Sequence, residues 1–265
     1  MAAVRVGLIA LPGIPLIRPG DDLAAILIQA IEAMGQRPCD RDVLVVAQKI
    51  VSKAEGRYRR LDEVTASTRA QEIAHQSHKD PRLIEVILSE SAEIIRCKRD
   101  VVIVEHRLGL IMANAGIDQS NVANPASGEF ALLLPEDPDT SAARLRARLA
   151  ELCGCEPGVV ISDSFGRPWR IGTVGVAIGC AGIPATLDLR GQTDLFGRAL
   201  RVTVVGHVDE IAAAASLLMG QADEGRPVIL VRGLAALHEA DTRSATAAAQ
   251  SASALIRPAQ QDLFR

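Results

Sequence analysis

The sequence predicts an α+β fold in which helices pack against mixed sheets. Strand-like and helical stretches alternate, but residues 101–113 and 174–205 each give strand patterns with no helix between them, so the order is not a regular strand–helix–strand repeat. No long polar linker interrupts the 265 residues, so any subdomains are expected to associate intimately. Because 48% of the residues are hydrophobic and only 2% are aromatic, the core is expected to be aliphatic.

In the first part of the chain, apolar patterns and capping residues place each element. β-Branched residues over 4–10 predict a first strand, and Gly and Pro over 13–20 predict a loop. Asp22 before and Gly35 after the periodic stretch 23–34 predict a helix with an acidic N-cap and a glycine stop.

The next stretch predicts a strand, two helices and a strand pair. Residues 42–51 form a continuous apolar run, which is typical of a strand buried on both faces. Helical patterns follow over 64–79 and 81–96. Two short strands are then expected over 101–105 and 108–113, joined by a tight turn.

The second half predicts two helices among short strands. An amphipathic helix is expected over 138–152, starting at Asp139, Thr140 or Ser141. A second helix over 209–220 ends in glycine. The strands expected in this half are at 158–162, 174–178, 200–205 and 227–232. The Ala/Ser-rich stretch 242–254 predicts a weak helix or a mobile tail.

Composition excludes several classes of function. The net charge of −3 gives no general attraction for nucleic acid or anionic lipid, and the few aromatic rings exclude a protein that stacks bases on them. No apolar run reaches the roughly 18 residues that span a bilayer, and residues 1–10 fit a strand better than a signal peptide. Five irregularly spaced cysteines predict reduced thiols in a cytoplasmic protein, and Cys153-Gly154-Cys155 has no second pair to make a metal site.

One candidate site follows the apolar strand that begins at residue 158. That strand is expected to deliver Asp163 and Ser164 at its carboxyl end, and a glycine turn would then present Arg167 and Arg170. Carboxylate and hydroxyl oxygens suit Mg²⁺, and guanidinium groups suit phosphate, so the segment predicts a metal–phosphate centre. The alternative is a capping aspartate beside surface arginines.

Three further segments could contribute to the same chemistry. Asp118 and Asn121 lie in a polar loop after a strand and could bind metal and phosphate, or the loop is an Asx-rich turn. Lysines over 48–57, Lys53 among them, could neutralise a phosphate, or they are a solvated strand end. Residues 220–226 have two glycines at P-loop spacing without the Lys-Ser/Thr pair, so they are either a phosphate-facing loop or a plain turn.

Taken together, these segments resemble one known family, the coenzyme F-420:L-glutamate ligases or gamma-glutamyl ligases. The resemblance runs from about residue 8 to residue 233. The motifs that carry it are GIPLIRPGDDL (13–23), DVLVVAQKIVSKAEGR (42–57), KDPRLIEVILSES (79–91), ANAGIDQSNV (113–122), LLPEDPDTSA (133–142), ISDSFGRPWRIG (161–172), AIGCAGI (177–183), RGQTDLFGRAL (190–200) and DEIAAAASLLMGQADEGRPVILVRG (209–233).

The resemblance implies an enzyme that makes an amide bond. In this family GTP phosphorylates the terminal carboxylate of the deazaflavin coenzyme precursor, and the amino group of L-glutamate attacks the acyl phosphate. The family requires Mg²⁺ or Mn²⁺, K⁺ is a further expected cation, and the fold forms a homodimer. The chain is expected to be the stand-alone form, with a ligase domain over 1–240, a tail over 241–265 and no nitroreductase-like domain.

The resemblance also assigns site residues. It implies metal ligation by Asp118, Asp163, Ser164 and Gln221, and catalytic roles for Asp118, Asp163 and Lys53. The nucleotide contacts that it implies are Ile14, Pro15, Leu16, Ile17, Gln48, Lys53, Asn121, Met219, Gly220, Gln221, Ala222, Asp223, Glu224, Gly225 and Arg226. Relatives often have Thr where this chain has Ser164, and Gln221 offers a neutral amide where a carboxylate would bind a cation more strongly.

Three arginines are assigned by spacing alone. Arg167, Arg170 and Arg190 are predicted to bind phosphate or a substrate carboxylate. Two other functions stay open at this point: a metal-dependent phosphohydrolase or nucleotide sensor on the same scaffold, and a structural or interaction module.

Overall fold

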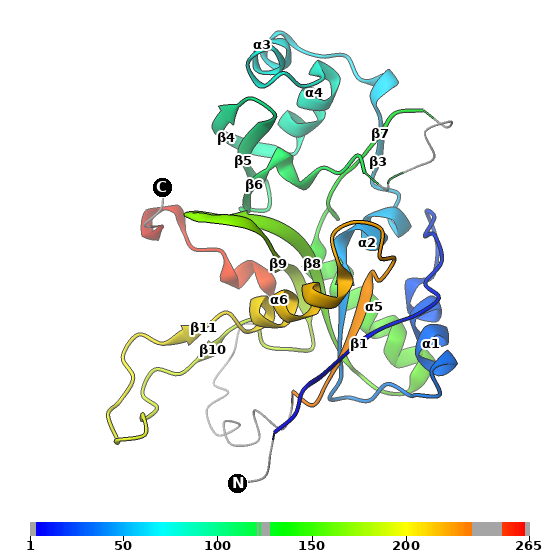
Figure 1. Cartoon of the computed structure of the whole chain (residues 1–265), viewed down its shortest axis with the longest axis vertical. Coiled ribbons are helices and arrows are strands. Elements are labelled where there is room, and N and C mark those ends of the chain that lie inside the picture. Colours follow the sequence, from blue (N-terminus) through cyan, green and yellow to red (C-terminus); the bar gives the residue numbers. More distant parts are fainter. Residues whose placement is uncertain (1–3, 121, 123–127, 235–250, 263–265) are drawn as a thin grey trace.

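A computed structural model describes residues 4–120, 122, 128–234 and 251–262 of the chain. Its central sheet has the strand order β1-β12-β2-β8-β9 (Figure 1). The strands are β1 (Gly7–Ala10), β12 (Val228–Arg232), β2 (Val43–Ala47), β8 (Gly158–Arg167) and β9 (Arg170–Ala181). Only β2 and β8 run parallel, and the other neighbours are antiparallel. The mixed α+β architecture predicted from the sequence is confirmed.

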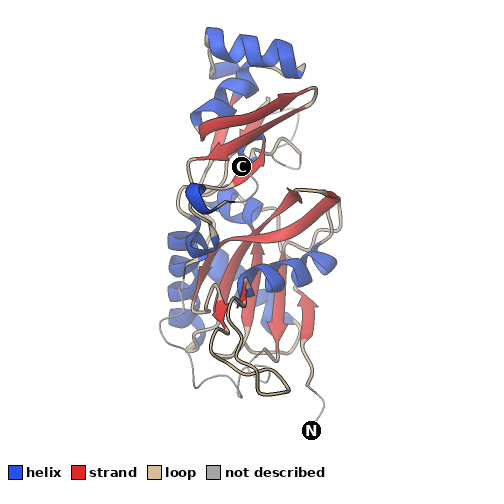
Figure 2. Ribbon diagram, turned by 90° about the vertical axis from the view of Figure 1, so that its left-hand side faces the viewer, coloured by secondary structure: helices blue, strands red, loops and turns tan. Residues whose placement is uncertain are grey.

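Helices cover both faces of this sheet (Figure 2). Leu44 and Val46 of β2 lie in the core beneath α1 (Leu23–Ala33) and α5 (Pro138–Cys153). The alternate residues of β2 pack in a second core with α6 (His207–Met219) on the opposite face. Side chains alternate between the faces of a strand, so a strand covered on both faces is apolar at every position. This explains the continuous apolar run that begins at residue 42.

Two glycines let the helices approach β9 closely. A Cβ on Gly175 would lie 2.4 Å from the carbonyl oxygen of Ala212 in α6, and one on Gly179 would lie 2.3 Å from the carbonyl oxygen of Pro138 in α5. These contacts are on opposite faces although the glycines are four residues apart. A β-bulge between the two registers, at Ile178, accounts for the change of face.

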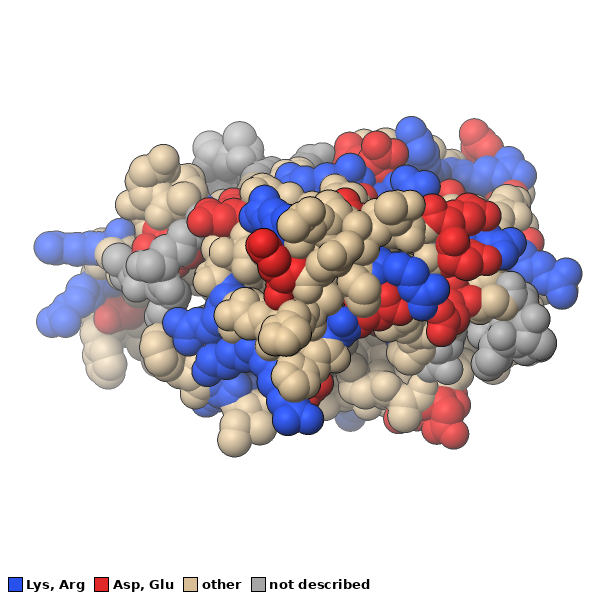
Figure 3. All heavy atoms as spheres, turned by 90° about the horizontal axis from the view of Figure 1, so that it is seen from above, with Lys and Arg blue, Asp and Glu red and all other residues tan. Residues whose placement is uncertain are grey.

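A second group of elements has its own core, above the central sheet in Figure 1. It combines α3 (Thr68–Ser77) and α4 (Pro81–Ser89) with a sheet of β4 (Ser91–Lys98), β5 (Val101–His106) and β6 (Ile111–Ala113). Figure 3 looks down on this end of the molecule, where acidic and basic side chains both occur on the visible face.

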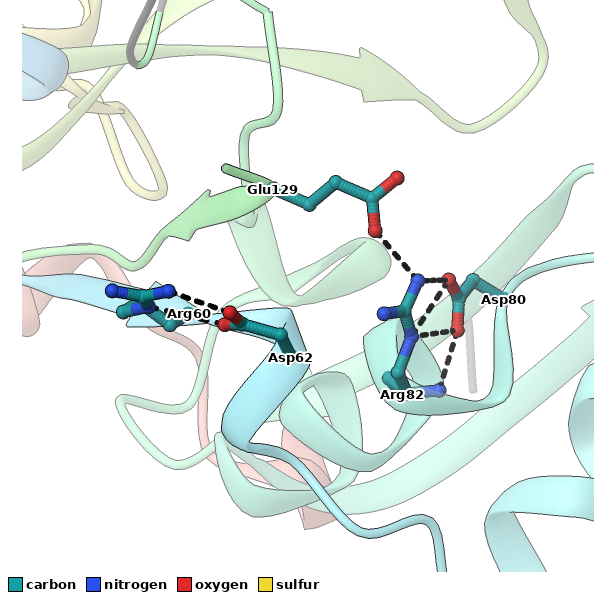
Figure 4. Close-up of polar contacts among 5 residues, drawn as sticks. All are labelled: Arg60, Asp62, Asp80, Arg82 and Glu129. Atoms are coloured by element: carbon teal, nitrogen blue, oxygen red, sulfur yellow. Dashed lines mark hydrogen bonds and ion pairs between the residues drawn. The ribbon is translucent and has the colours of Figure 1, made fainter. Parts of the chain in front are cut away.

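An ion pair joins the start of α4 to Glu129, the residue before β7 (Phe130–Leu132) (Figure 4). β7 forms a two-stranded sheet with β3 (Tyr58–Arg60). Asp80 caps α4 by accepting from the backbone N–H of Arg82 at 2.8 Å. The guanidinium of Arg82 contacts both carboxylate oxygens of Asp80 and reaches Glu129 at 2.6 Å. In this cluster each carboxylate has its cation within hydrogen-bonding distance.

Several predicted boundaries were wrong. The strand expected over 42–51 ends at Ala47, where α2 (Gln48–Ala54) begins. The helix expected over 64–79 begins at Thr68, because Ser67 caps it. The helix expected over 81–96 ends at Ser89, because residues 91–98 pair with β5 instead. Strand pairing here overrides a local helical pattern.

Other differences concern the second half. α5 begins at Pro138 with Asp137 as its cap, whose side chain accepts from the Thr140 N–H at 3.0 Å. The strand expected over 200–205 shortens to β11 (Val204–Val205), paired with β10 (Leu187–Asp188). Most of the Ala/Ser-rich stretch lies outside the described residues, and its end forms a 3₁₀ turn over Ala252–Leu255. Among the described helices, none has the length and apolar character needed to cross a bilayer.

Candidate active site

A cavity of about 430 Å³ opens at the carboxyl end of β2. It is bounded by the loop before α1, the start of α2, the middle of β8 and the loop between α6 and β12. Most of the residues that the resemblance assigns to nucleotide or metal line it: Ile14, Pro15, Leu16, Ile17, Gln48, Lys53, Asp163, Ser164, Met219, Gly220, Gln221, Ala222, Asp223, Glu224, Gly225 and Arg226. The structure therefore gathers four distant segments around one space.

The β2–α2 junction supplies the polar side chains on one wall. Gln48 is buried, with 1% of its surface exposed. Its Oε1 accepts from Ser52 Oγ at 2.9 Å, and its Nε2 donates to Asp118 Oδ2 at 2.8 Å. Because the hydroxyl fixes which end of the amide faces the aspartate, Gln48 holds the Asp118 carboxylate in one orientation.

Asp118 reaches this wall from the second group of elements through an unusual turn. Asn114, Ala115 and Gly116 have φ angles of 51°, 54° and 64°, so three successive residues are left-handed. For a residue with a Cβ this conformation costs roughly 1–2 kcal/mol. Ala115 is fully buried, and Asp118 exchanges two backbone hydrogen bonds with Leu132 of β7. The surrounding packing thus holds a strained turn that aims Asp118 at the cavity wall.

Asp163 comes from the middle of β8, not from its end as predicted. The strand continues through Gly166 to Arg167, because residues up to that point pair with β9. Asp163 Oδ1 accepts from the backbone N–H of Ser164 at 2.8 Å. Both residues line the cavity at the place where β8 passes the start of α2.

The charge of Asp118 acts on Asp163. Burial, together with the negative charge of Asp118, raises the pKa of Asp163 to about 7. Burial also raises the pKa of Asp118, against the opposing effect of Lys49, whose Nζ lies 3.3 Å from Asp118 Oδ1. A negative charge close to a buried carboxyl group raises the pKa of that group. Asp118 therefore lies close enough to Asp163 for its charge to act on it, and the metal-binding and catalytic roles of the two aspartates stay predictions.

Two lysines face this pair from α2. Burial and the charge of Lys49 lower the pKa of Lys53, while Asp118 acts in the opposite direction. Lys49 also lies 3.5 Å from Ser120 Oγ. Of the two lysines in this segment, only Lys53 was predicted from the sequence to have a role. The ion pair of Lys49 joins residues 69 positions apart, so no local pattern could have identified it.

The loop after α6 forms the opposite wall. α6 ends at Gly220, which has a φ of 73°, and Glu224 Oε2 accepts from the Ala222 N–H at 2.8 Å. A Cβ on Gly220 would lie 2.0 Å from Glu224 Cδ. The side chain of Glu224 therefore packs against Gly220, and the hydrogen bond that it accepts from the Ala222 N–H links two residues within the loop. The two glycines at P-loop spacing belong to a cavity wall, not to a plain turn.

The three arginines predicted by spacing lie elsewhere. Arg167 and Arg170 are at the end of the β8–β9 hairpin and do not line the cavity. Arg190 is bonded to Asp188, whose pKa it lowers to about 2. The hairpin extends past the cavity because β8 continues through Gly166. Asn121, the remaining predicted contact, lies outside the described residues.

The donor set at the cavity fits a hard divalent cation. Among the lining residues, Asp163 supplies a carboxylate, Ser164 a hydroxyl and Gln221 an amide, and Mg²⁺ and Mn²⁺ prefer such oxygen ligands. Asp118 does not itself line the cavity, but its carboxylate is hydrogen-bonded to the lining residue Gln48. Burial is the main cause of the raised pKa of Asp163, and the charge of Asp118 outweighs the opposing effect of Lys49. Among the described residues, no cluster of three or more acidic, His or Cys side chains forms a candidate metal site. A cation bound at this site would therefore need ligands besides acidic, His and Cys side chains.

Comparison with known proteins identifies the family of the chain. Residues 13–233 match the family model for F420-0:gamma-glutamyl ligase. The chain is 45% identical over 260 residues to the coenzyme F420:L-glutamate ligase of Methanothermobacter thermautotrophicus, covering 98% of this chain and 99% of that protein. The proteins of the same name from Methanopyrus kandleri and Methanocaldococcus jannaschii are 46% and 38% identical, covering 94% and 95% of this chain and 93% and 94% of theirs. The chain therefore belongs to the F420-0:gamma-glutamyl ligase family.

Proposed function

We propose that this chain attaches L-glutamate to the deazaflavin coenzyme F-420 precursor through an amide bond, with GTP as the activating nucleotide. A carboxylate oxygen of the precursor attacks the γ-phosphorus, and GDP leaves. The glutamate nitrogen then attacks the acyl carbon, the bond from that carbon to the phosphate oxygen breaks, and phosphate and a proton are released. Membership of the ligase family supports this reaction.

The observation that carries the proposal is that Asp118 and Asp163 lie close together beside a cavity, two of whose walls are loops. The walls are the loop at 14–17 and the loop at 219–226. A nucleotide needs enclosure by backbone and apolar groups, and its phosphates need positive charge. Both requirements are met in one place by segments that are distant in the chain.

Each group on the wall has a definite task in this proposal. Lys49 and Lys53 place positive charge beside the site, where charge on the transferred phosphoryl group is stabilised. Gln48 keeps the Asp118 carboxylate turned toward the site through its 2.8 Å hydrogen bond. Asp118, Asp163, Ser164 and Gln221 would hold Mg²⁺ or Mn²⁺, which supplies charge neutralisation at the phosphate oxygens when bound.

The proposal includes a homodimer. The β8–β9 hairpin and the β10–β11 loop expose large apolar side chains: Trp169 is 88% exposed, Leu195 98% and Phe196 95%. Apolar side chains of this size on projecting segments indicate a surface that another protein covers. Light scattering should give twice the mass of the chain, and a monomer across the concentrations used for activity would contradict this part.

The decisive experiment is incubation with the precursor, L-glutamate, GTP and Mn²⁺, followed by mass analysis of the coenzyme. The proposal predicts an added glutamyl residue and release of phosphate only when both acceptor and amine are present. Replacing GTP by ATP tests the nucleotide preference. Phosphate release without glutamate would instead favour a phosphohydrolase. If metal and GTP together left the thermal midpoint unchanged, the protein would not be a nucleotide enzyme.

A further inference from the structure

A second group of reactive side chains lies at the other end of the parallel strand pair. The cavity is at the carboxyl end of β2, whereas Cys39 precedes β2 and Cys153 and Cys155 precede β8. The loops that carry them are bonded together, because the Glu156 N–H donates to Asp40 Oδ1 at 2.7 Å. None of the three cysteines lines the ligase cavity.

The geometry brings two of the sulfur atoms together. Cys153 is the last residue of α5, and Gly154 caps the helix with a φ of 70° while its N–H donates to the carbonyl oxygen of Ala150. This left-handed residue turns the chain back, so that Cys153 Sγ and Cys155 Sγ lie 3.0 Å apart. Nothing lies within 4 Å of a Cβ built on Gly154, so its conformation, not packing, requires the glycine.

We propose that Cys153 and Cys155 form a reversible disulfide by exchange with a low-molecular-weight disulfide. The thiolate of Cys153 attacks one sulfur of that reagent, forming a mixed disulfide and expelling one thiolate. Cys155, after losing its proton, attacks Cys153 Sγ and expels the second thiolate. The protein pair loses two electrons and two protons, and the reagent is reduced to two thiols.

The surroundings support this order of attack. Cys155 is hydrogen-bonded to Cys153 and lies near Asp40 and Cys39, and burial together with these groups raises the pKa of its thiol to about 12. Cys155 therefore stays protonated in neutral solution and suits the second, intramolecular step, where proximity compensates for a small thiolate fraction. Cys153 also donates to the Leu149 carbonyl oxygen at 3.0 Å, which orients its sulfur at the helix end.

The other cysteines provide internal controls. Cys180 is buried, with 2% of its surface exposed, and Cys97 lies in β4 in the other core. Cys39 is exposed and close to the pair, so it is the competing partner that the experiment must distinguish.

The test is equilibration of the whole protein in a glutathione–glutathione disulfide buffer, followed by acid quenching, alkylation and peptide mass mapping. We expect the peptide with Cys153 and Cys155 to lose two hydrogen atoms without an adduct, and to regain two alkylatable thiols when excess reduced glutathione is added. Cys97 and Cys180 should stay alkylatable throughout.

Two variants sharpen the result. Cys155→Ser should trap one glutathione adduct on Cys153, while Cys39→Ser should oxidise like the unaltered protein. A disulfide that includes Cys39, or two thiols that remain alkylatable in the most oxidising buffer, would overturn the proposal. Because the pair lies away from the cavity, glutamate ligation should be the same in both variants as in the unaltered protein.

Discussion

In two groups of charged residues in this protein, the pKa values of the carboxyl groups shift in opposite directions. At the start of α4, Arg82 forms hydrogen bonds with Asp80 and holds the pKa of that carboxyl below its usual range (Figure 4). At the cavity, burial and the charge of Asp118 raise the pKa of Asp163 to about 7. Both groups combine acidic and basic side chains, so composition alone does not separate them.

The difference lies in where the balancing charge comes from. Asp80 and Glu129 each form an ion pair with the guanidinium of Arg82, at the partly exposed start of α4. Asp118 has Lys49 at 3.3 Å, but Asp163 has no comparable ion pair among the described residues. An ionised carboxylate that is buried without an ion pair destabilises the folded protein, and under the proposed function a bound divalent cation would supply the balancing charge. The ion pairs of the first cluster stabilise the folded protein, whereas the burial of Asp163 disfavours its ionised form.

The largest expected effect is the loss of activity in Asp163→Asn. The amide keeps the shape but removes the charge, so glutamate ligation should fall by about 100-fold or more. The thermal midpoint at pH 8 should rise, because the repulsion from Asp118 disappears. Activity assays and thermal unfolding of the same preparation measure both. Full activity in this variant would exclude a metal-binding role for Asp163.

The pH dependence of stability should also separate the two clusters. The Asp163 pKa is about 7 in the folded protein and about 4 in the unfolded chain, so the folded state binds more protons between these values. Its contribution to the free energy of unfolding therefore decreases as pH rises from about 4 to 7. Denaturant titrations at several pH values should show this slope in the metal-free protein.

Matched variants of Asp163 and Asp80 test the direction in which the free energy of unfolding changes with pH. Asp163→Asn should flatten the slope over that range. Asp80, with its lowered pKa, contributes stability that is present above about pH 4 and is lost as pH falls through its folded pKa. Asp80→Asn should therefore change the acid limb below pH 4 and leave the slope near pH 6 unaltered. Identical pH profiles for both variants would remove the distinction between the clusters.

The loop over the cavity allows a smaller, paired test. Gly220→Ala places a methyl against Glu224 and strains a residue with a φ of 73°, so the KM for GTP should rise about 10-fold. Gly225→Ala has a similar φ of 65° but open space around the new methyl, so it carries the strain without the collision. Steady-state kinetics should give a larger KM for the first variant. Equal values would show that closure by Glu224 is unimportant.

The smallest effect is expected from the surface cluster. Asp80→Asn keeps a capping oxygen and Asp80→Ala does not, so the alanine variant should lose about 1 kcal/mol of unfolding free energy and the asparagine variant less. Arg82→Ala should have a smaller effect than Asp80→Ala, because it removes solvent-screened ion pairs and leaves the helix cap in place. All three should keep normal ligation rates in the same assay. A loss of activity comparable to that of Asp163→Asn would show that the clusters are not separate.

The sequence predicted the parts of the site that lie next to strands or helices. The segments around Gln48, Asp163 and Gly220 each adjoin or interrupt an apolar element, so local patterns located them. The polar loop that holds Asp118 was also found from a local pattern, but the placement of Asp118 beside Gln48 depends on a left-handed turn and on backbone hydrogen bonds to Leu132. Arg167 and Arg170 were misplaced for the same reason, because pairing with β9 carries β8 beyond the cavity.

Mn²⁺ binding by calorimetry or electron paramagnetic resonance, with and without GTP, tests the central claim most directly. The unaltered protein should bind Mn²⁺ in the presence of GTP, and Asp118→Asn and Asp163→Asn should each weaken this binding by about 10-fold or more. Asp80→Asn should bind as the unaltered protein does. Undiminished Mn²⁺ affinity in both cavity variants would contradict the claim that these two aspartates together hold the cation.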